Sequence, residues 1–238
     1  MHRPLFKNYY RLALKHAMLR LGLVKDGYIT IKCFDGSSTQ TTLYTIGKLI
    51  YWYTYGDVKE IDCLHNNVRF YNGSLIPIDE VMLSDGIGDA LSYGWRYDAD
   101  NGYWTRGYVK FRHMHVPIIE VFNLKQYVFA NVKDRVIVDV GAFVGDSAIY
   151  FVLRGAKKVY AVEPHPGAYR EMLENIRLNN LEDRIIPINA ALGDKRGVIK
   201  IPTVDVDSAG VMYYGLDSAG NAGSEVPVVT LSELIEEY

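Results

Sequence analysis

This sequence has few cysteines, no long apolar run and no large excess of charge of either sign. Its two cysteines, Cys33 and Cys63, belong to no CxxC motif, so no disulfide framework is required and a reducing, cytoplasmic environment is expected, with one bridge between them left open. No run is apolar for long enough to form a transmembrane segment. The net charge of −2 gives no whole-molecule attraction for nucleic acid or for acidic substrates.

Several catalytic and targeting motifs are also absent. No GxSxG, HExxH or GxxxxGK[ST] occurs, so nucleophile-elbow hydrolases, zinc peptidases and P-loop enzymes lack support. His113 and His115 stand two residues apart and would share one side of a strand, but no third ligand is evident, so no metal is expected. Basic residues spread through the N-terminal segment also break up any apolar core of a signal peptide.

The N-terminal segment has helical periodicity. Residues 4–23 are predicted to form an amphipathic helix, and Lys7, Arg11 and Lys15 form a basic stripe along it. Such a helix could face solvent, lie on an anionic membrane or contact RNA. The residues expected on its buried face are Phe6, Tyr10, Ala13, Ala17 and Leu21.

From residue 28 to about residue 108 the pattern favours short strands. The segments 28–34 and 68–71 are followed by Asp-Gly and Asn-Gly turns, which predict a small antiparallel unit. This unit is rich in Tyr and Trp, which would form either its core or a surface that faces the substrate. We therefore predict two domains: residues 1–115, with the N-terminal helix and this β-rich aromatic unit, and residues 116–238, an α/β domain.

The α/β domain shows alternating strands and helices. Strands are predicted at 135–140, 158–162 and 184–188, and helices between them at about 146–154 and 167–179. This β-α-β-α-β order is the first half of a doubly wound, Rossmann-like sheet. Ligands of such sheets lie at the carboxyl ends of the strands, where this sequence places the glycine turn GAFVG, residues 141–145, and the carboxylate of Glu163.

The charges around this turn favour one cofactor class. The turn lacks the GxGxxG pattern that a pyrophosphate requires, and Asp139 and Asp146 would repel such a group. S-adenosylmethionine (SAM) instead carries a sulfonium and an ammonium, which carboxylates attract. Three structural alternatives stay open: the glycines serve only a tight turn, Asp146 or Ser147 caps the helix, and Glu163 is a solvated strand end.

Four sequence segments resemble the FkbM family of SAM-dependent methyltransferases. They are VDVGAFVGD at 138–146, VEPHP at 162–166 with Asn175 and LN at 178–179, NAALGD at 189–194 with Gly197, and VPVVTL at 226–231. The resemblance covers about residues 117–238. It implies a class I SAM-dependent methyltransferase that transfers a methyl group to a hydroxyl of a small molecule or glycan.

The same resemblance implies which residues bind SAM. Asp139, Gly141, Ala142 and Gly145 would line its methionine part, Glu163 would hold the ribose, and Asn189 and Ala190 would lie near the adenine. Glu120 would also reach the methionine end. His165, in the loop after Glu163, is expected to be solvated. The predicted set is completed by Phe143, Asp146, Ser147 and Pro164.

The resemblance departs from the family after VPVVTL. Thr230 and Glu233 form a capping box for one more helix, but no fourth strand follows, so the sequence is expected to be a truncated sheet. The glycine-turn strand would then have an uncovered edge, through which a homo-oligomer is expected to form. The family's acceptor-side residues lie in the absent part, so no catalytic residue is nominated.

Three other functions remain open. The segments 157–163 and 174–180 also resemble the archaeal tRNA guanine methyltransferases, which would make RNA the acceptor. Only the N-terminal helix offers a stripe for phosphates, which disfavours that alternative. A truncated, non-catalytic nucleoside-binding domain is the second alternative, and an NAD-dependent enzyme is the third.

Overall fold

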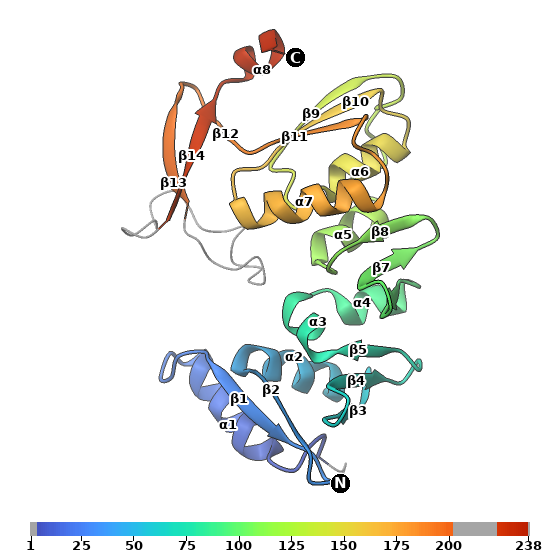
Figure 1. The fold of residues 1–238 in the computed structure, drawn as a ribbon, viewed down its shortest axis with the longest axis vertical. Helices are drawn as coiled ribbons and strands as arrows, with labels where there is room; N and C mark the ends of the chain where they lie inside the picture. Colours follow the sequence, from blue (N-terminus) through green and yellow to red (C-terminus); the bar gives the residue numbers. More distant parts are fainter. Residues whose placement is uncertain (1–3, 202–222, 238) are drawn as a thin grey trace. The chain divides into compact units, whose positions relative to one another are not determined.

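The computed structural model describes residues 4–201 and 223–237, and the chain divides into two compact units (Figure 1). Unit 1 comprises residues 1–106 together with 113–115. Unit 2 comprises residues 107–112 together with 116–238. In the described ranges, no helix is both long enough and apolar enough to cross a membrane.

Unit 1 combines short helices with antiparallel strands. The hairpin β1–β2 turns at Gly36, whose φ of +92° suits glycine. The Thr42 side chain then caps α2 by accepting from the Thr45 N–H. In chain order the elements are α1 (Tyr9–Arg20), β1 (Tyr28–Lys32), β2 (Ser38–Thr42), α2 (Leu43–Thr54), β3 (Val58–Asp62), β4 (Asn67–Phe70), β5 (Leu75–Pro77), α3 (Ile78–Leu83), α4 (Ile87–Ser92), β6 (Arg96–Asp98) and β7 (Tyr103–Arg106).

The helix α1 is shorter than predicted and buries other residues. Leu12 is its buried residue, and Leu5 and Phe6 are buried just before it begins. Tyr10 and Leu21, expected on the buried face, are 68% and 73% exposed. The prediction was wrong because the apolar residues of this helix are spread over all of its faces. Its packing against α2 decides which of them are buried.

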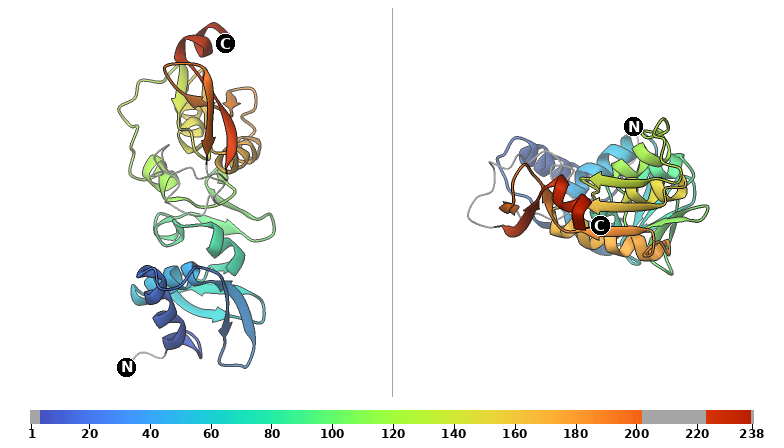
Figure 2. Two further views of the ribbon diagram at one scale, coloured as in Figure 1. Left: turned by 90° about the vertical axis from the view of Figure 1, so that its left-hand side faces the viewer. Right: turned by 90° about the horizontal axis from the view of Figure 1, so that it is seen from above.

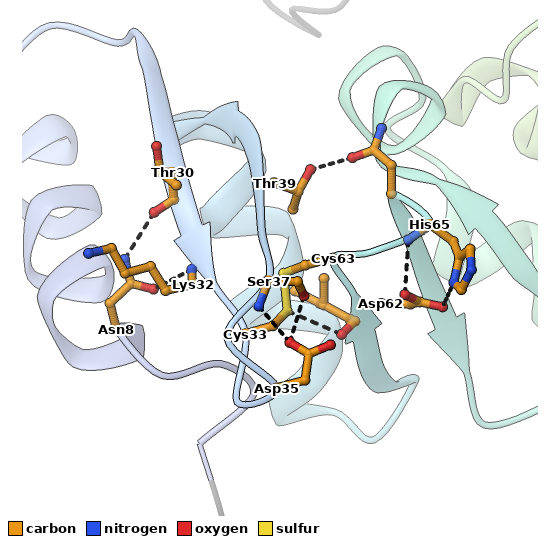
Figure 3. The surroundings of a disulfide bond; sticks show 12 residues. Asn8, Thr30, Lys32, Cys33, Asp35, Ser37, Thr39, Asp62, Cys63 and His65 are labelled. Carbon is orange, nitrogen blue, oxygen red and sulfur yellow. Dashed lines mark hydrogen bonds and ion pairs between the residues drawn. A yellow bond between two sulfur atoms is a disulfide. The ribbon is translucent and has the colours of Figure 1, made fainter.

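A disulfide joins two parts of unit 1 (Figure 3). Cys33 follows β1 and Cys63 follows β3, and their Cα atoms are 6.1 Å apart. Both side chains are buried. The bridge that the sequence left open is therefore formed, and it ties the β1–β2 hairpin to the β3–β4–β5 sheet.

The core of unit 1 contains a buried polar network instead of a metal site. The carboxylate of Glu80 accepts from the Trp104 Nε1–H at 2.6 Å and from the Ser84 hydroxyl. His113 Nδ1 lies 2.8 Å from the other Glu80 oxygen, and His115 Nδ1 lies 3.8 Å from Asp85. Across the described ranges, no three His, Cys, Asp or Glu side chains are grouped to hold a metal. Here the two histidines pair with acids.

Unit 2 contains the parallel sheet. Its strands pair in the order β11–β10–β9, and both connecting helices, α6 and α7, lie on one face of the sheet (Figure 1). This is the strand order that right-handed β-α-β crossovers produce. The elements are β8 (Val109–Phe111), α5 (Val116–Phe122), β9 (Val136–Val140), α6 (Asp146–Leu153), β10 (Lys158–Val162), α7 (Pro166–Leu178), β11 (Ile185–Ile188), β12 (Ala191–Leu192), β13 (Gly197–Ile201), β14 (Ser224–Val229) and α8 (Leu231–Glu237).

A second small sheet follows the parallel one. β14 pairs with β12 in parallel and with β13 antiparallel, and Figure 2 shows the β13–β14 pair. The predicted capping box is confirmed: the Thr230 N–H donates to Glu233 Oε2, and the Glu233 N–H donates to the Thr230 hydroxyl. Leu234 of α8 packs against Val162 and Ala190. This contact places α8 against the carboxyl end of β10.

The strand β9 lies at the edge of the parallel sheet. In the described part of the chain it pairs with β10 and with no other strand. Val136 and Val140 are 55% and 53% exposed, which is unusual for apolar residues of a parallel strand. The uncovered edge that the sequence predicted is therefore present in the described ranges.

Candidate functional site

The loop between β9 and α6 is fixed to the end of β10. The backbone N–H groups of Gly141 and Ala142 both donate to the Val162 carbonyl, at 2.9 and 3.1 Å. Three residues of the loop have positive φ: Gly141 at +75°, Phe143 at +48° and Gly145 at +84°. Phe143 is costly in this region, and such backbone strain gathers at ligand-binding loops.

Glu163 compensates for that strain by binding the loop directly. Its Oε2 accepts from the Phe143 N–H at 2.8 Å, and its Oε1 accepts from the His165 N–H at 2.7 Å. The side chain is 6% exposed, so the solvated-end alternative is wrong. Burial raises the pKa of Glu163, while the two N–H donors lower it in part.

Asp139 lies at the other side of the loop. Its Oδ2 accepts from the Ser147 hydroxyl at 2.6 Å. Burial raises the pKa of Asp139, and the Ser147 hydroxyl opposes that rise. Ser147 thus orients a carboxylate and does not cap its helix. The N-cap of α6 is Gly145, so the capping alternative for Ser147 and for Asp146, the first helical residue, is wrong.

The carboxylates around the loop share one region. Repulsion from Asp139 contributes to the raised pKa of Glu163. The Tyr127 hydroxyl lies near the same acids. Burial is the main cause that raises its pKa, and the negative charges of Asp139, Asp146 and Glu120 raise it further. Asp139, Asp146 and Glu120 therefore lie near the Tyr127 hydroxyl, and Asp139 also lies near Glu163; no basic side chain is among the causes of these shifts.

The two glycines of the loop have different roles. A Cβ on Gly145 would lie 3.0 Å from Cγ of Met172 on α7, so this glycine allows the loop to pack on the helix. A Cβ on Gly141 would meet nothing within 4 Å. No atom of the chain would block a ligand beside the Gly141 backbone, and the φ of +75° suits a tight turn as well, so the binding role and the turn role are both compatible with the structure.

Asn189 and Ala190 support the end of β10. The Asn189 amide donates to the Glu163 carbonyl at 2.8 Å and to the Pro164 carbonyl at 3.3 Å. Ala190 is buried against Val162. These contacts hold the backbone that carries the Glu163 carboxylate. Their predicted place beside an adenine stays a prediction.

The supporting roles of three residues were not predicted from the sequence. Asn175 on α7 is fully buried; its amide donates to the Val144 carbonyl at 2.9 Å and its Oδ1 accepts from the Arg112 N–H at 2.7 Å. His165 is buried instead of solvated, and its Nδ1 caps α7 by accepting from the Ala168 N–H. Tyr127 gave no signal because it lies outside every motif. A polar residue on the apolar face of a helix, as at Asn175, is a signal that could have been used.

These features fit SAM better than a dinucleotide. The carboxylates suit an ammonium and a sulfonium, the space beside Gly141 admits a ligand against the backbone, and each oxygen of Glu163 retains a lone pair for a ribose hydroxyl. A pyrophosphate would meet these acids in the same region. The geometry therefore supports the SAM prediction and disfavours NAD.

Comparison with known proteins finds similarity to a different family from the one that the sequence motifs suggested. Residues 122–215 match the TRM5/TYW2 methyltransferase domain. Over 63 residues the chain is 44% identical to a tRNA (guanine(37)-N(1))-methyltransferase of Methanocaldococcus jannaschii, which covers 26% of this chain and 17% of that protein. A tRNA (guanine(37)-N(1))-methyltransferase of Batrachochytrium dendrobatidis is 26% identical over 65% of this chain and 29% of its own length.

The chain is also similar in part to a solved structure. The TYW2 protein of P. horikoshii, crystallised with MeSAdo, is 25% identical over 43% of this chain and 45% of its own, with a TM-score of 0.32. The chain spans less than a third of the length of the curated relatives it matches. The FkbM prediction is wrong, because the family model that matches is that of the TRM5/TYW2 methyltransferase domain and two relatives are tRNA (guanine(37)-N(1))-methyltransferases. The predicted class is confirmed: unit 2 contains a Rossmann-like parallel sheet, and residues 122–215 match a methyltransferase domain, that of TRM5/TYW2.

Proposed function

We propose that this chain is the cofactor-binding part of an RNA methyltransferase that modifies guanine in tRNA. The observation that carries the proposal is the Glu163 carboxylate, which is held between the glycine loop and the start of α7 and lies near the carboxylate of Asp139. That arrangement is a site for a cationic nucleoside. The family match, to a methyltransferase domain, supports methyl transfer as its use.

Each side of the site takes one part of the cofactor in this proposal. Glu163 accepts hydrogen bonds from the ribose hydroxyls while its two backbone donors keep it in place. Asp139, oriented by Ser147, faces the ammonium of the methionine part together with Glu120. Asn189 holds the carbonyls beside Glu163, so the adenine side of the site is rigid.

Bound SAM supplies an electrophilic methyl group on its sulfonium. The residues of this chain contribute orientation and exclusion of water, which together account for much of the barrier lowering in such displacements. The acids also stabilise the cation before transfer. No described residue is assigned as the base that deprotonates the acceptor, and the catalytic residue stays unassigned.

RNA replaces the small-molecule acceptor that the sequence motifs suggested. Two relatives named as tRNA guanine methyltransferases support this choice, and the O-methylation of a small molecule or glycan finds no support among the matches. The net charge of −2, which disfavoured RNA, does not describe the distribution of charge: α1 and the residues before it carry Lys7, Arg11, Lys15 and Arg20 without an acidic residue.

The test is transfer of a radiolabelled methyl group from SAM to tRNA transcripts. We expect labelling of tRNA that depends on a guanine, none of simple sugars or phenols, and loss of labelling with Glu163→Gln. Calorimetry should show SAM binding to the wild type and at least tenfold weaker binding to that variant. SAM binding without any tRNA labelling would contradict the acceptor, and absence of SAM binding at millimolar concentration would contradict the whole proposal.

A further inference from the structure

Unit 1 contains an open groove that the methyltransferase site does not use. Its volume is about 740 Å³, and α2 forms one wall while α4 and the residues before it form the other. A smaller hollow of about 240 Å³ shares Asp57, Gly88 and Ser92 with it, so the two are continuous. This volume is in the range of sites for small organic ligands.

The α2 wall is aromatic. Tyr44, Tyr51 and Tyr55 recur at the spacing of one helix face and are 44%, 58% and 70% exposed. The rings of Tyr51 and Tyr55 are 4.6 Å apart at their centroids. Lys48, on the same face, is occupied: its ammonium donates to the carbonyls of three residues at the end of α3, Val81, Met82 and Ser84. The wall therefore offers exposed rings, which stack on unpaired bases.

Three acids line the groove: Asp57 in the loop after α2, Asp89 on α4, and Asp85 just before α4, whose carboxylate lies 3.8 Å from His115 Nδ1. Burial and the neighbouring Asp89 raise the pKa of Asp57. Throughout the described ranges, no group donates a hydrogen bond to the carboxylate of Asp57 or Asp89, although Asp57 is half-buried. The lack of a side chain at Gly88, whose Cβ would lie 3.5 Å from Asp57 Oδ2, leaves room beside that carboxylate. Two adjacent acceptors without donors favour a ligand that brings N–H groups.

The far end of the groove is basic. His16 Nδ1 binds the Leu43 carbonyl at 3.0 Å, and the absence of a side chain at Gly47 makes room for its ring. Arg20, one turn further along α1, is exposed, and no described acid pairs with it. From this end to Tyr55, α2 extends about 16 Å at 1.5 Å per residue, which is longer than one nucleotide.

We propose that this groove binds an unpaired guanine within a single-stranded segment of RNA. The base would stack on Tyr51 and Tyr55, and its ring N–H and amino group would donate to Asp57 and Asp89. A phosphate further along the strand would lie near Arg20. The length between the acidic and basic ends favours a strand over a free nucleotide. The inference rests on the proposed function for RNA as the substrate, and this guanine is a second contact, separate from the methylated base.

The test is equilibrium binding of labelled hexaribonucleotides, by fluorescence anisotropy, to the full chain without SAM. An oligo-U strand with one central guanine should bind about tenfold or more tightly than the same strand with adenine, since one carboxylate can accept both guanine donors. Asp57→Asn should reduce this preference to less than about threefold, because an amide oxygen accepts while its NH₂ opposes the donors. Tyr51→Ala should weaken all strands about tenfold. Tyr28→Ala, which removes an exposed tyrosine from β1, is the matched control and should change nothing.

Several outcomes would overturn the inference. They are equal binding of the guanine and adenine strands, binding of GMP as tight as that of the strand, and a guanine preference that survives Asp57→Asn. The result is separable from the proposed function. If tRNA is methylated and Asp57→Asn leaves the binding profile unchanged, the groove inference fails while the proposed function stands. If the groove prefers guanine and SAM does not bind, the proposed function fails while the groove inference stands.

Discussion

Breaking the Cys33–Cys63 bridge should destabilise unit 1 selectively. The bridge closes a loop of about 30 residues between two parts of the unit that are otherwise joined by packing and by hydrogen bonds such as that from Thr39 to Asn66. In the chain-entropy treatment, a loop of that length contributes about 3.6 kcal/mol to the free energy of unfolding. A unit of roughly 100 residues unfolds in urea with a slope near 1.5 kcal/mol per molar, so the midpoint should fall by about 2.4 M.

The assay can be confined to unit 1, because all three tryptophans, Trp52, Trp95 and Trp104, lie there and are buried. Urea titration followed by tryptophan fluorescence, with and without a phosphine reductant, measures the midpoint. The double variant Cys33→Ser with Cys63→Ser should match the reduced wild type and ignore the reductant. SAM binding, which reports on unit 2, serves as an internal control. Coincident midpoints for the oxidised and reduced wild type would refute the reasoning.

Four further predictions concern unit 2. Gly141→Val should abolish SAM binding in calorimetry, because a β-branched residue is strained at a φ of +75° and its side chain would enter the space proposed for the ligand; retained affinity would contradict that placement. Asn175→Ala should cost about 3 kcal/mol in denaturant unfolding followed by circular dichroism, because two buried backbone groups lose their partner; a change below about 1 kcal/mol would refute this. The pKa values of Asp139 and Glu163 are raised in the folded state, so the folded state binds protons more tightly than the unfolded one. Without ligand, the free energy of unfolding should therefore increase as the pH falls from the folded pKa towards the ordinary value near 4. This added stability should be lost as the pH rises through the folded pKa. SAM needs the ionised forms, so its thermal shift should shrink on acidification, and less so in Glu163→Gln. Val136→Lys should reduce any self-association through the β9 edge, measured by light scattering, while an oligomer unaffected by the change would lie elsewhere.

The sequence predicted the parallel sheet well because its signals are local. Strands rich in β-branched residues, a glycine loop with three positive φ angles and a carboxylate after the second strand all occur within about 30 residues. The predicted bounds of β9 and β10 agree with the structure to within one residue. The family could not be predicted in the same way, since the segments used for it surround the cofactor, and cofactor loops are shared by methyltransferases with different acceptors.

What the sequence could not supply was the meeting of distant side chains. Tyr51 and Tyr55 have the spacing of a helix face that would normally be buried, yet they are exposed and line the groove. Asp57 and Asp89 are 32 positions apart and become neighbours only when α4 packs beside α2. Trp104 and His113, which contact Glu80 from 24 and 33 residues away, likewise come from separate elements. Such contacts depend on tertiary packing, which periodicity alone does not encode.

The net charge of −2 disfavours RNA only where affinity comes mainly from phosphates, because each released counterion then steepens the salt dependence. The proposed groove would bind RNA in a different way. Stacking on Tyr51 and hydrogen bonds to Asp57 need no excess of positive charge, and the groove offers Arg20 as its exposed cation. Binding through the groove should therefore have a shallow slope, on the order of −1 in log K against log salt for one or two phosphate contacts on a single strand. A slope steeper than about −3 would place the RNA on the basic face of α1 instead, with Arg11 and Lys15 as its main contacts.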